Sequence, residues 1–220
     1  MLLKLDNVSV QFNERKILDR LDLSVARGEF VVIIGDNGAG KSTLFNVIAG
    51  QENPTSGRVV RNFLKITRVM QDPRVGTLGN MTVKENLAFA YKRESRRGWR
   101  PCINKDRISM FREKLKILNM NLEDKLNDTV QTLSGGQRQA LAFAMAVLVD
   151  YDIILLDEVT AALNPESASN LMELINRTVR IDQKTCLMIT HNPAHEKYGD
   201  RVLKLENGRL YDAGPIKKVK

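Results

Sequence analysis

The segment from Gly35 to Thr43 contains the residue types that a phosphate-binding loop needs. It reads GDNGAGKST, follows the apolar run Phe30–Ile34, and matches the P-loop pattern G-x-x-x-x-G-K-[ST]. Glycines permit a tight turn whose N–H groups face phosphate oxygens, while Lys41 can reach the β- and γ-phosphates and Ser42 can bind Mg²⁺. The alternative is an ordinary glycine-rich turn. We expect the whole segment to bind nucleotide phosphates: Gly35, Asp36, Asn37, Gly38, Ala39, Gly40, Lys41, Ser42 and Thr43.

Two neighbouring carboxylates follow a second apolar run, Ile153–Asp157, in the sequence IILLDE. An acidic group at the end of such a strand can hold Mg²⁺ through its water shell, and we expect Asp157 to do so. On an extended backbone Glu158 would point away from Asp157 and could polarise a water molecule aimed at the γ-phosphate. Without the glycine loop, the pair would more simply be solvated.

Ser134 begins a second candidate anion site, within the sequence LSGGQ. It precedes a helical pattern, and the start of a helix presents a hydroxyl group and backbone N–H groups to an anion. We expect Ser134, Gly135 and Gly136 to form this anion site, with Gln137 completing the motif. The alternative is a capped helix with a flexible entry.

The elements that position these residues follow from the apolar patterns. Alternating apolar residues in 3–10 and 21–25 predict antiparallel strands. Thr82 and Glu85 form a capping-box pattern, and residues 105–118 repeat apolar positions at helical spacing. The middle of the chain is therefore predicted to be helical.

The second half alternates helices and strands, which indicates a parallel sheet with crossover helices. Asn207–Gly208 predicts a hairpin near the end. We expect one α/β domain over 1–220, with a mostly parallel P-loop NTPase core, an N-terminal antiparallel β-subdomain and an inserted helical subdomain at about 72–150. The alternating elements are predicted at Gln137–Val149, Ile153–Asp157, Glu166–Ile181 and Thr185–Thr190.

Composition limits the class of protein. The 220 residues are 43% hydrophobic, enough for a full core, yet no apolar run approaches the roughly 20 residues of a membrane span. The first residues, MLLKLDNVSV, include charges within what would be a signal core, so we expect a cytoplasmic protein that could lie on a membrane. Cys102 and Cys186 lack metal-ligand spacing and are expected to be free thiols.

The net charge of +8 permits nucleic acid, anionic lipid or nucleotide as partners. The excess gathers in residues 92–100, which include Trp99, and in the tail at Lys217, Lys218 and Lys220. Each cluster is either solvated or in contact with a membrane protein or lipid headgroups.

With these motifs in this order, the chain resembles the nucleotide-binding subunit of ABC transporters over essentially its whole length. The resemblance implies that Phe12 stacks on adenine, that Gln71 senses Mg²⁺ and the attacking water, and that His191 donates a hydrogen bond to the γ-phosphate. From the residues alone, Phe12 could be a strand-face core residue and Gln71 a polar strand end. His195 is expected to be an ordinary surface histidine.

The resemblance also implies partners and cofactors. Two such subunits would pack head to tail, each binding ATP and Mg²⁺ between the P-loop of one and the LSGGQ of the other. Hydrolysis would drive a separate integral membrane permease, with an extracytoplasmic substrate-binding protein acting indirectly. The subunit would be peripheral, at the cytoplasmic face of the inner membrane. A weaker resemblance is to the subgroup of importers with tryptophan/tyrosine-type substrate-binding proteins, which suggests an amino acid or another small solute.

Three positions depart from the family pattern. Val159 replaces a proline, Asn164 replaces the D-loop aspartate, and Met145 stands where a later arginine is common. Asn164 is also a favoured helix N-cap, and Pro165 suits the first helical position. The departure at Asn164 therefore indicates either capping alone or altered hydrolysis and subunit communication.

Three other functions stay open from sequence. The motor motifs do not encode direction, so the chain could serve an ABC exporter. It could be a non-transport ABC ATPase acting on nucleic acid or ribosomes, although it lacks the insertions usual there and no nucleic acid is expected. It could also be a regulatory nucleotide binder that barely hydrolyses ATP.

Overall fold

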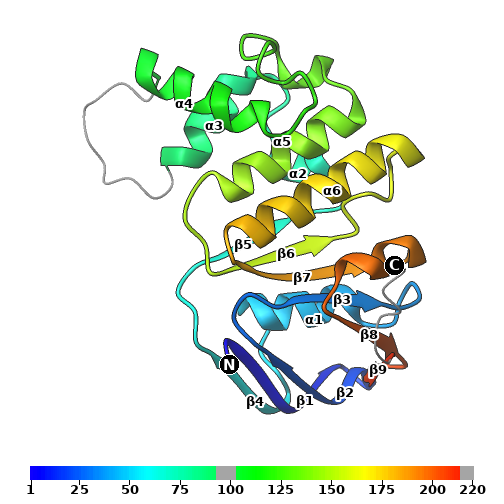
Figure 1. Ribbon diagram of the computed structural model, residues 1–220. Coiled ribbons are helices and arrows are strands. Elements are labelled where there is room, and N and C mark those ends of the chain that lie inside the picture. Colours follow the sequence, from blue (N-terminus) through cyan, green and yellow to red (C-terminus); the bar gives the residue numbers. More distant parts are fainter. Residues whose placement is uncertain (93–102, 214–220) are drawn as a thin grey trace. The chain divides into compact units, whose positions relative to one another are not determined.

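The computed structural model describes residues 1–92 and 103–213, which form two compact units (Figure 1). The first unit comprises Met1–Ile66, Asp152–Glu158 and Val179–Lys220, and the second comprises Thr67–Tyr151 and Val159–Thr178. The basic segment beyond Lys92, with Trp99, and also Cys102 and the lysines of the tail lie outside the described residues.

An antiparallel sheet opens the first unit, as predicted. Its strands are β1 (Leu3–Phe12), β2 (Arg15–Val25) and β4 (Ser56–Arg61), in the order β2-β1-β4. Apolar side chains alternate along β1 and β2 and are buried, because one face of the sheet covers the core.

A mostly parallel sheet forms the centre of the first unit. Within this unit its strands run in the order β6-β7-β3-β8-β9, and all of these neighbours are parallel except the hairpin β8–β9. Cys186 lies in β7 as a free thiol whose pKa is raised by burial. The carboxyl ends of the parallel strands meet at one edge. The strands are β3 (Phe30–Ile34), β6 (Ile153–Asp157), β7 (Thr185–Thr190), β8 (Arg201–Glu206) and β9 (Arg209–Asp212).

Helix α1 (Lys41–Ala49) lies between the two sheets of this unit (Figure 1). Its residues Leu44, Phe45, Val47 and Ile48 are fully buried and join one core with side chains from β1, β2, β3, β6, β7 and β8. Gly50 ends the helix in the left-handed conformation, with φ of 75°. The short 3-10 helix η2 (Pro193–Tyr198) follows β7.

The second unit is largely helical. Thr82 and Glu85 form the predicted capping box, in which the Glu85 carboxylate accepts from the Thr82 backbone N–H at 2.7 Å. Helix α5 begins two residues before the predicted Gln137, because Ser134 caps it. The division between the units falls within β5 (Ile66–Val69). The helices are α2 (Pro73–Gly76), α3 (Val83–Lys92), α4 (Lys105–Lys116), η1 (Val130–Thr132), α5 (Gly135–Val147) and α6 (Pro165–Ile181), whose end belongs to the first unit.

These elements confirm the predicted α/β class, with a mostly parallel sheet and a separate antiparallel one. Over residues 1–92 and 103–213, none of the helices is both long enough and apolar enough to cross a bilayer.

Candidate functional site

The loop from Gly35 to Gly40 joins β3 to α1 and needs its glycines for two different reasons. Gly38 and Gly40 have φ of 83° and 102°, which L side chains rarely adopt. Gly35 instead lies against β8, where a Cβ atom would be 2.4 Å from the carbonyl oxygen of Leu205. The space around Gly38 is open, because a Cβ atom added there would meet no atom within 4 Å. The loop therefore packs closely against β8 at Gly35, and the space beside Gly38 is open.

Lys41 is the first residue of α1 and its side chain folds back into the loop. The buried ammonium group donates to the carbonyl oxygens of Gly35 at 2.7 Å and Asp36 at 3.2 Å. It also lies 3.2 Å from Oε1 of Glu158. Ser42 is exposed on the first helical turn, beside the open loop. This arrangement places a cation and a hydroxyl group where an anion could reach them.

Glu158 connects the loop to two strands. Its carboxylate contacts Lys41 through Oε1 and Nδ1 of His191 through Oε2, each at 3.2 Å. The backbone expectation for Glu158 was wrong: the residue leaves β6 in the left-handed region, with φ of 46°, while its N–H donates to Ile189 of β7. The chain turns at once after Asp157, which is buried at the end of β6.

The two histidines after β7 differ in their surroundings. His191 directly follows the strand, and its side chain is 58% exposed apart from the contact with Glu158. The prediction for His195 was wrong, because this residue is 5% exposed and hydrogen-bonded to Thr190. Burial lowers the pKa of His195, and the nearby charges of His191 and Lys197 lower it further.

Phe12 ends β1 and is paired with Arg15 across the turn to β2. Its relative exposure is 46%, so the strand-face core interpretation was wrong. An exposed ring can stack on a flat ligand.

Gln71 and the LSGGQ segment belong to the second unit. Gln71 follows β5 and is exposed. Ser134 and Gln137 form a complete capping box at the start of α5, and Gln137 also donates to the carbonyl oxygen of Met120 at 3.2 Å. A Cβ atom at Gly136 would be 3.2 Å from Ser167, so this glycine allows a close approach. The capped-helix interpretation is thus confirmed, and nucleotide contact stays a prediction.

The N-cap role of Asn164 is also confirmed, because its Oδ1 accepts from the Ser167 N–H at 2.8 Å and α6 begins at Pro165. The other two departures are accommodated as well. Val159 is buried in the turn after β6, and Met145 is half-buried in α5, which continues to Val147.

The sequence did not indicate which residues of β2 pack against the glycine loop, or which residues stabilise β2 there. A Cβ atom at Gly40 would be 2.8 Å from Leu18 of β2. The neighbouring residue, Asp19, accepts from Lys16 at 2.9 Å and Arg209 at 2.7 Å, which together hold its pKa at about 2. Its N–H donates to Gly208 at 2.8 Å. Only the hairpin signal at Asn207–Gly208 pointed to this join between β2 and β9.

A glycine loop between a strand and a helix, with its lysine facing an acid at a second strand end, defines a P-loop nucleotide-binding protein. The chain belongs to the ABC transporter family, whose model matches residues 18–161.

Known relatives extend this match. A tyrosine transport ATP-binding protein of Clostridioides difficile is 37% identical over 227 aligned residues, covering 95% of this chain and 90% of that protein. The aliphatic sulfonates import ATP-binding protein SsuB 1 of Burkholderia cenocepacia is 35% identical over 94% of this chain, which spans only 61% of that relative.

Solved structures agree on the fold. The dimeric cassette MJ0796 in a post-hydrolysis state with ADP and Pi has a TM-score of 0.79 at 28% identity, covering 98% of this chain and all of that one. The ADP conformation of the cassette MJ1267 has a TM-score of 0.83 at 27% identity, with 99% and 92% covered.

Proposed function

We propose that this chain is the ATP-binding and ATP-hydrolysing subunit of an ABC importer. The observation that carries the proposal is the convergence of Lys41, Glu158 and His191 beside an open glycine loop, at the carboxyl ends of parallel strands. The names of the relatives, which are transport and import ATP-binding proteins, support the same direction of transport.

The loop residues fit a nucleotide. Gly35 to Thr43 would hold the phosphates, because N–H groups, a lysine and open space lie together there. Ser42, Asp157 and Gln71 offer the oxygen ligands that Mg²⁺ prefers. When bound, Mg²⁺ would neutralise charge on the phosphate oxygens.

The chain's own residues would then act as follows. Phosphate oxygens replace the carbonyl groups of Gly35 and Asp36 as partners of Lys41. Glu158, freed on its Oε1 side, polarises a water molecule toward the γ-phosphate. His191 donates a hydrogen bond to the same phosphate while it stays near Glu158.

A second copy would complete each site. Ser134 to Gln137 would contact the nucleotide held by the partner's loop, which the dimeric state of the MJ0796 cassette supports. Phe12 would stack on the adenine. The subunit would dock on an integral permease at the cytoplasmic face of the inner membrane, with a helical subdomain at about 72–150 passing on the motion. An extracytoplasmic binding protein would deliver an amino acid or another small solute.

ATP turnover of Glu158→Gln tests the enzymatic part. We expect kcat to fall at least about 100-fold, as for loss of a general base, while the Kd for MgATP stays within about threefold. Glu206→Gln is the matched control, because Glu206 pairs with Lys204 on the exposed face of β8. Equal turnover of wild type and Glu158→Gln would refute the ATPase assignment.

Purification of the tagged chain from native membranes tests the importer part. We expect a multi-spanning permease and, after cross-linking, an extracytoplasmic binding protein. Recovery of ribosomes or nucleic acid instead, with a steep salt dependence, would contradict it.

A further inference from the structure

His195 contacts both residues that flank His191. Its Nδ1 is 3.1 Å from the hydroxyl oxygen of Thr190, and its Nε2 is 3.4 Å from the side-chain nitrogen of Asn192. The ring is buried within η2 and lies near Tyr198, with ring centroids 6.5 Å apart. The buried imidazole of His195 thus contacts the turn after β7, whereas the side chain of His191 is mostly exposed.

The hydrogen-bond network sets the tautomer of His195. Oδ1 of Asn192 accepts from the N–H of Ala194 at 3.0 Å, which turns the amide nitrogen toward the imidazole ring. An amide nitrogen only donates, so Nε2 of His195 must accept. In the neutral ring the proton is then on Nδ1, which donates to Thr190. The lowered pKa of His195 agrees with a neutral ring at pH 7.

Thr190 and Asn192 are also joined to each other. The hydroxyl oxygen of Thr190 accepts from the backbone N–H of Asn192 at 3.1 Å, and the N–H of His195 donates to the carbonyl oxygen of Asn192. Two hydrogen-bonded residues therefore clamp the backbone on each side of His191. Because the side chain of His191 is mostly exposed, this backbone largely sets its direction toward Glu158.

We infer that His195 is a positioning residue, which holds His191 in contact with the Glu158 carboxylate through Thr190 and Asn192. This inference rests on the proposed function, in which His191 and Glu158 act on the γ-phosphate. The rival explanation is packing alone, in which any ring of similar size would serve.

A double-mutant cycle separates the two explanations. His195→Phe keeps a ring and removes both hydrogen bonds, and we expect it to lower kcat about 10-fold with KM for ATP within twofold. In a His191→Ala background the same change should alter kcat less than twofold. His195→Asn, whose amide can donate to Thr190, should recover part of the rate. An equal loss in both backgrounds, or no loss with His191 present, would overturn the inference.

A second readout does not depend on turnover. The chain contains two histidines, so His195→Phe leaves a single imidazole NMR signal, that of His191. We expect its chemical shift to move toward that of the Glu158→Gln protein, which lacks the carboxylate contact. An unmoved signal would overturn the inference even if no variant hydrolysed ATP, whereas a moved signal without any turnover would count against the proposed function alone. If His195→Phe does not fold, Thr190→Val replaces it, with the same expected change in kcat; its two imidazole signals are then assigned with the His191→Ala protein, and the His191 signal is expected to move in the same direction.

Discussion

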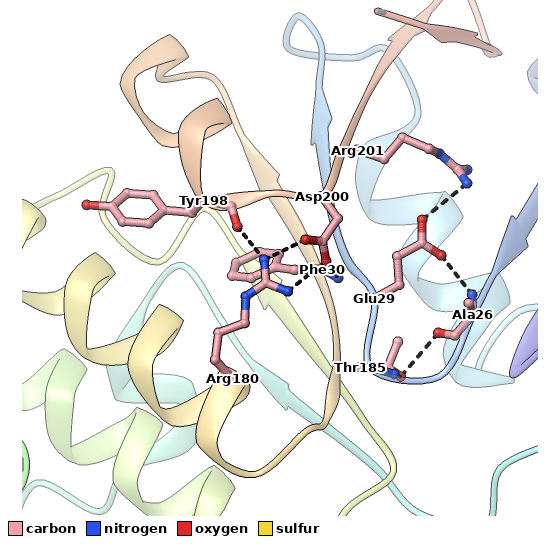
Figure 2. Close-up of polar contacts among 9 residues, drawn as sticks. Ala26, Glu29, Phe30, Arg180, Thr185, Tyr198, Asp200 and Arg201 are labelled. Atoms are coloured by element: carbon pink, nitrogen blue, oxygen red, sulfur yellow. Dashed lines mark hydrogen bonds and ion pairs between the residues drawn. The ribbon is translucent and has the colours of Figure 1, made fainter. Parts of the chain in front are cut away.

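At the amino ends of β3 and β8, an arginine from α6 is hydrogen-bonded to protein partners (Figure 2). Arg180 donates to both carboxylate oxygens of Asp200, at 2.7 and 2.8 Å, and to the carbonyl oxygen of Tyr198 at 3.2 Å. Asp200 in turn accepts from the N–H of Phe30 at 2.8 Å, and the guanidinium lies over the Phe30 ring.

A second cluster occupies the same amino edge (Figure 2). Glu29 accepts from the N–H of Ala26 at 2.7 Å and pairs with Arg201 at 3.2 Å. The Thr185 hydroxyl donates to the Ala26 carbonyl oxygen. The Glu29–Arg201 pair joins the starts of β3 and β8, and the Thr185–Ala26 bond joins the start of β7 to the loop after β2.

At the carboxyl edge, Lys41 has partners of another kind. They are carbonyl groups of its own loop and one carboxylate, beside open space at Gly38. A phosphate could take the place of the two carbonyl groups without breaking a hydrogen bond between strands. Similar charges thus stabilise the fold at one edge and, in our proposal, bind a ligand at the other.

The largest expected effect is that of Lys41→Ala. Removing the ammonium should raise the Kd for MgATP at least about 100-fold, because charged hydrogen bonds contribute about 1.5–3 kcal/mol each. Isothermal titration calorimetry measures it. Lys204→Ala, which removes an exposed lysine of β8, is the control. A Kd within threefold of wild type would contradict the role of this edge.

Gly40→Ala should have the next largest effect. The left-handed backbone and the approach of Leu18 cost about 1–3 kcal/mol and distort the loop, so we expect roughly 10-fold weaker MgATP binding. Gly76→Ala is the matched control, since a Cβ atom there meets nothing within 4 Å. If the two variants bind MgATP equally, the contact between Gly40 and Leu18 of β2 does not determine the shape of the binding site.

Arg180→Ala probes the amino edge. The side chains of Arg180 and Asp200 are 40% and 45% exposed, so solvent screening limits the loss to about 1 kcal/mol, or about 2–4 °C in Tm. Affinity for MgATP should stay unchanged. Differential scanning calorimetry measures Tm, and a binding titration measures the Kd for MgATP. A higher Kd in Arg180→Ala would show that the amino edge also contributes to binding, contrary to the proposal.

The smallest effect is expected for Asp19, which is the residue next to Leu18. Its ion pairs with Lys16 and Arg209 stabilise the fold and, in our proposal, do not bind the ligand. Its folded pKa of about 2 is below the usual 3.8, so its contribution to stability is complete above pH 3.8 and is lost as pH falls toward 2. NMR titration should give that midpoint, and Arg209→Ala should raise it toward 3.8. An unchanged midpoint would mean that the pair does not form in solution.

Much of the first unit could be predicted from sequence. The bounds of β6 and β7 agree with the predicted ranges, because buried parallel strands read as continuous apolar runs. The glycine loop follows from its spacing, and Gly50 marks the end of α1.

What the sequence could not reveal depends on contacts between distant residues. The burial of His195 follows from the fold of η2 after β7, where the ring is hydrogen-bonded to Thr190, and the spacing of residues in the sequence does not indicate it. Glu158 turns left-handed where its N–H meets Ile189, and Gly35 is required by Leu205 of another strand. The roles of Gln71 and of Ser134 to Gln137 stay predictions, because these residues belong to the second unit. In our proposal, Ser134 to Gln137 also act on nucleotide held by a second copy.

One thermal-shift experiment tests the contrast between the edges most directly. Tm is measured with and without MgATP at about 100 times the wild-type Kd, which should stabilise the wild type by about 2.7 kcal/mol, or roughly 5–10 °C. We predict the same rise for Arg180→Ala from a lower starting Tm, and a rise of about 1 °C or less for Lys41→Ala. A full rise in Lys41→Ala, or none in Arg180→Ala, would contradict the account.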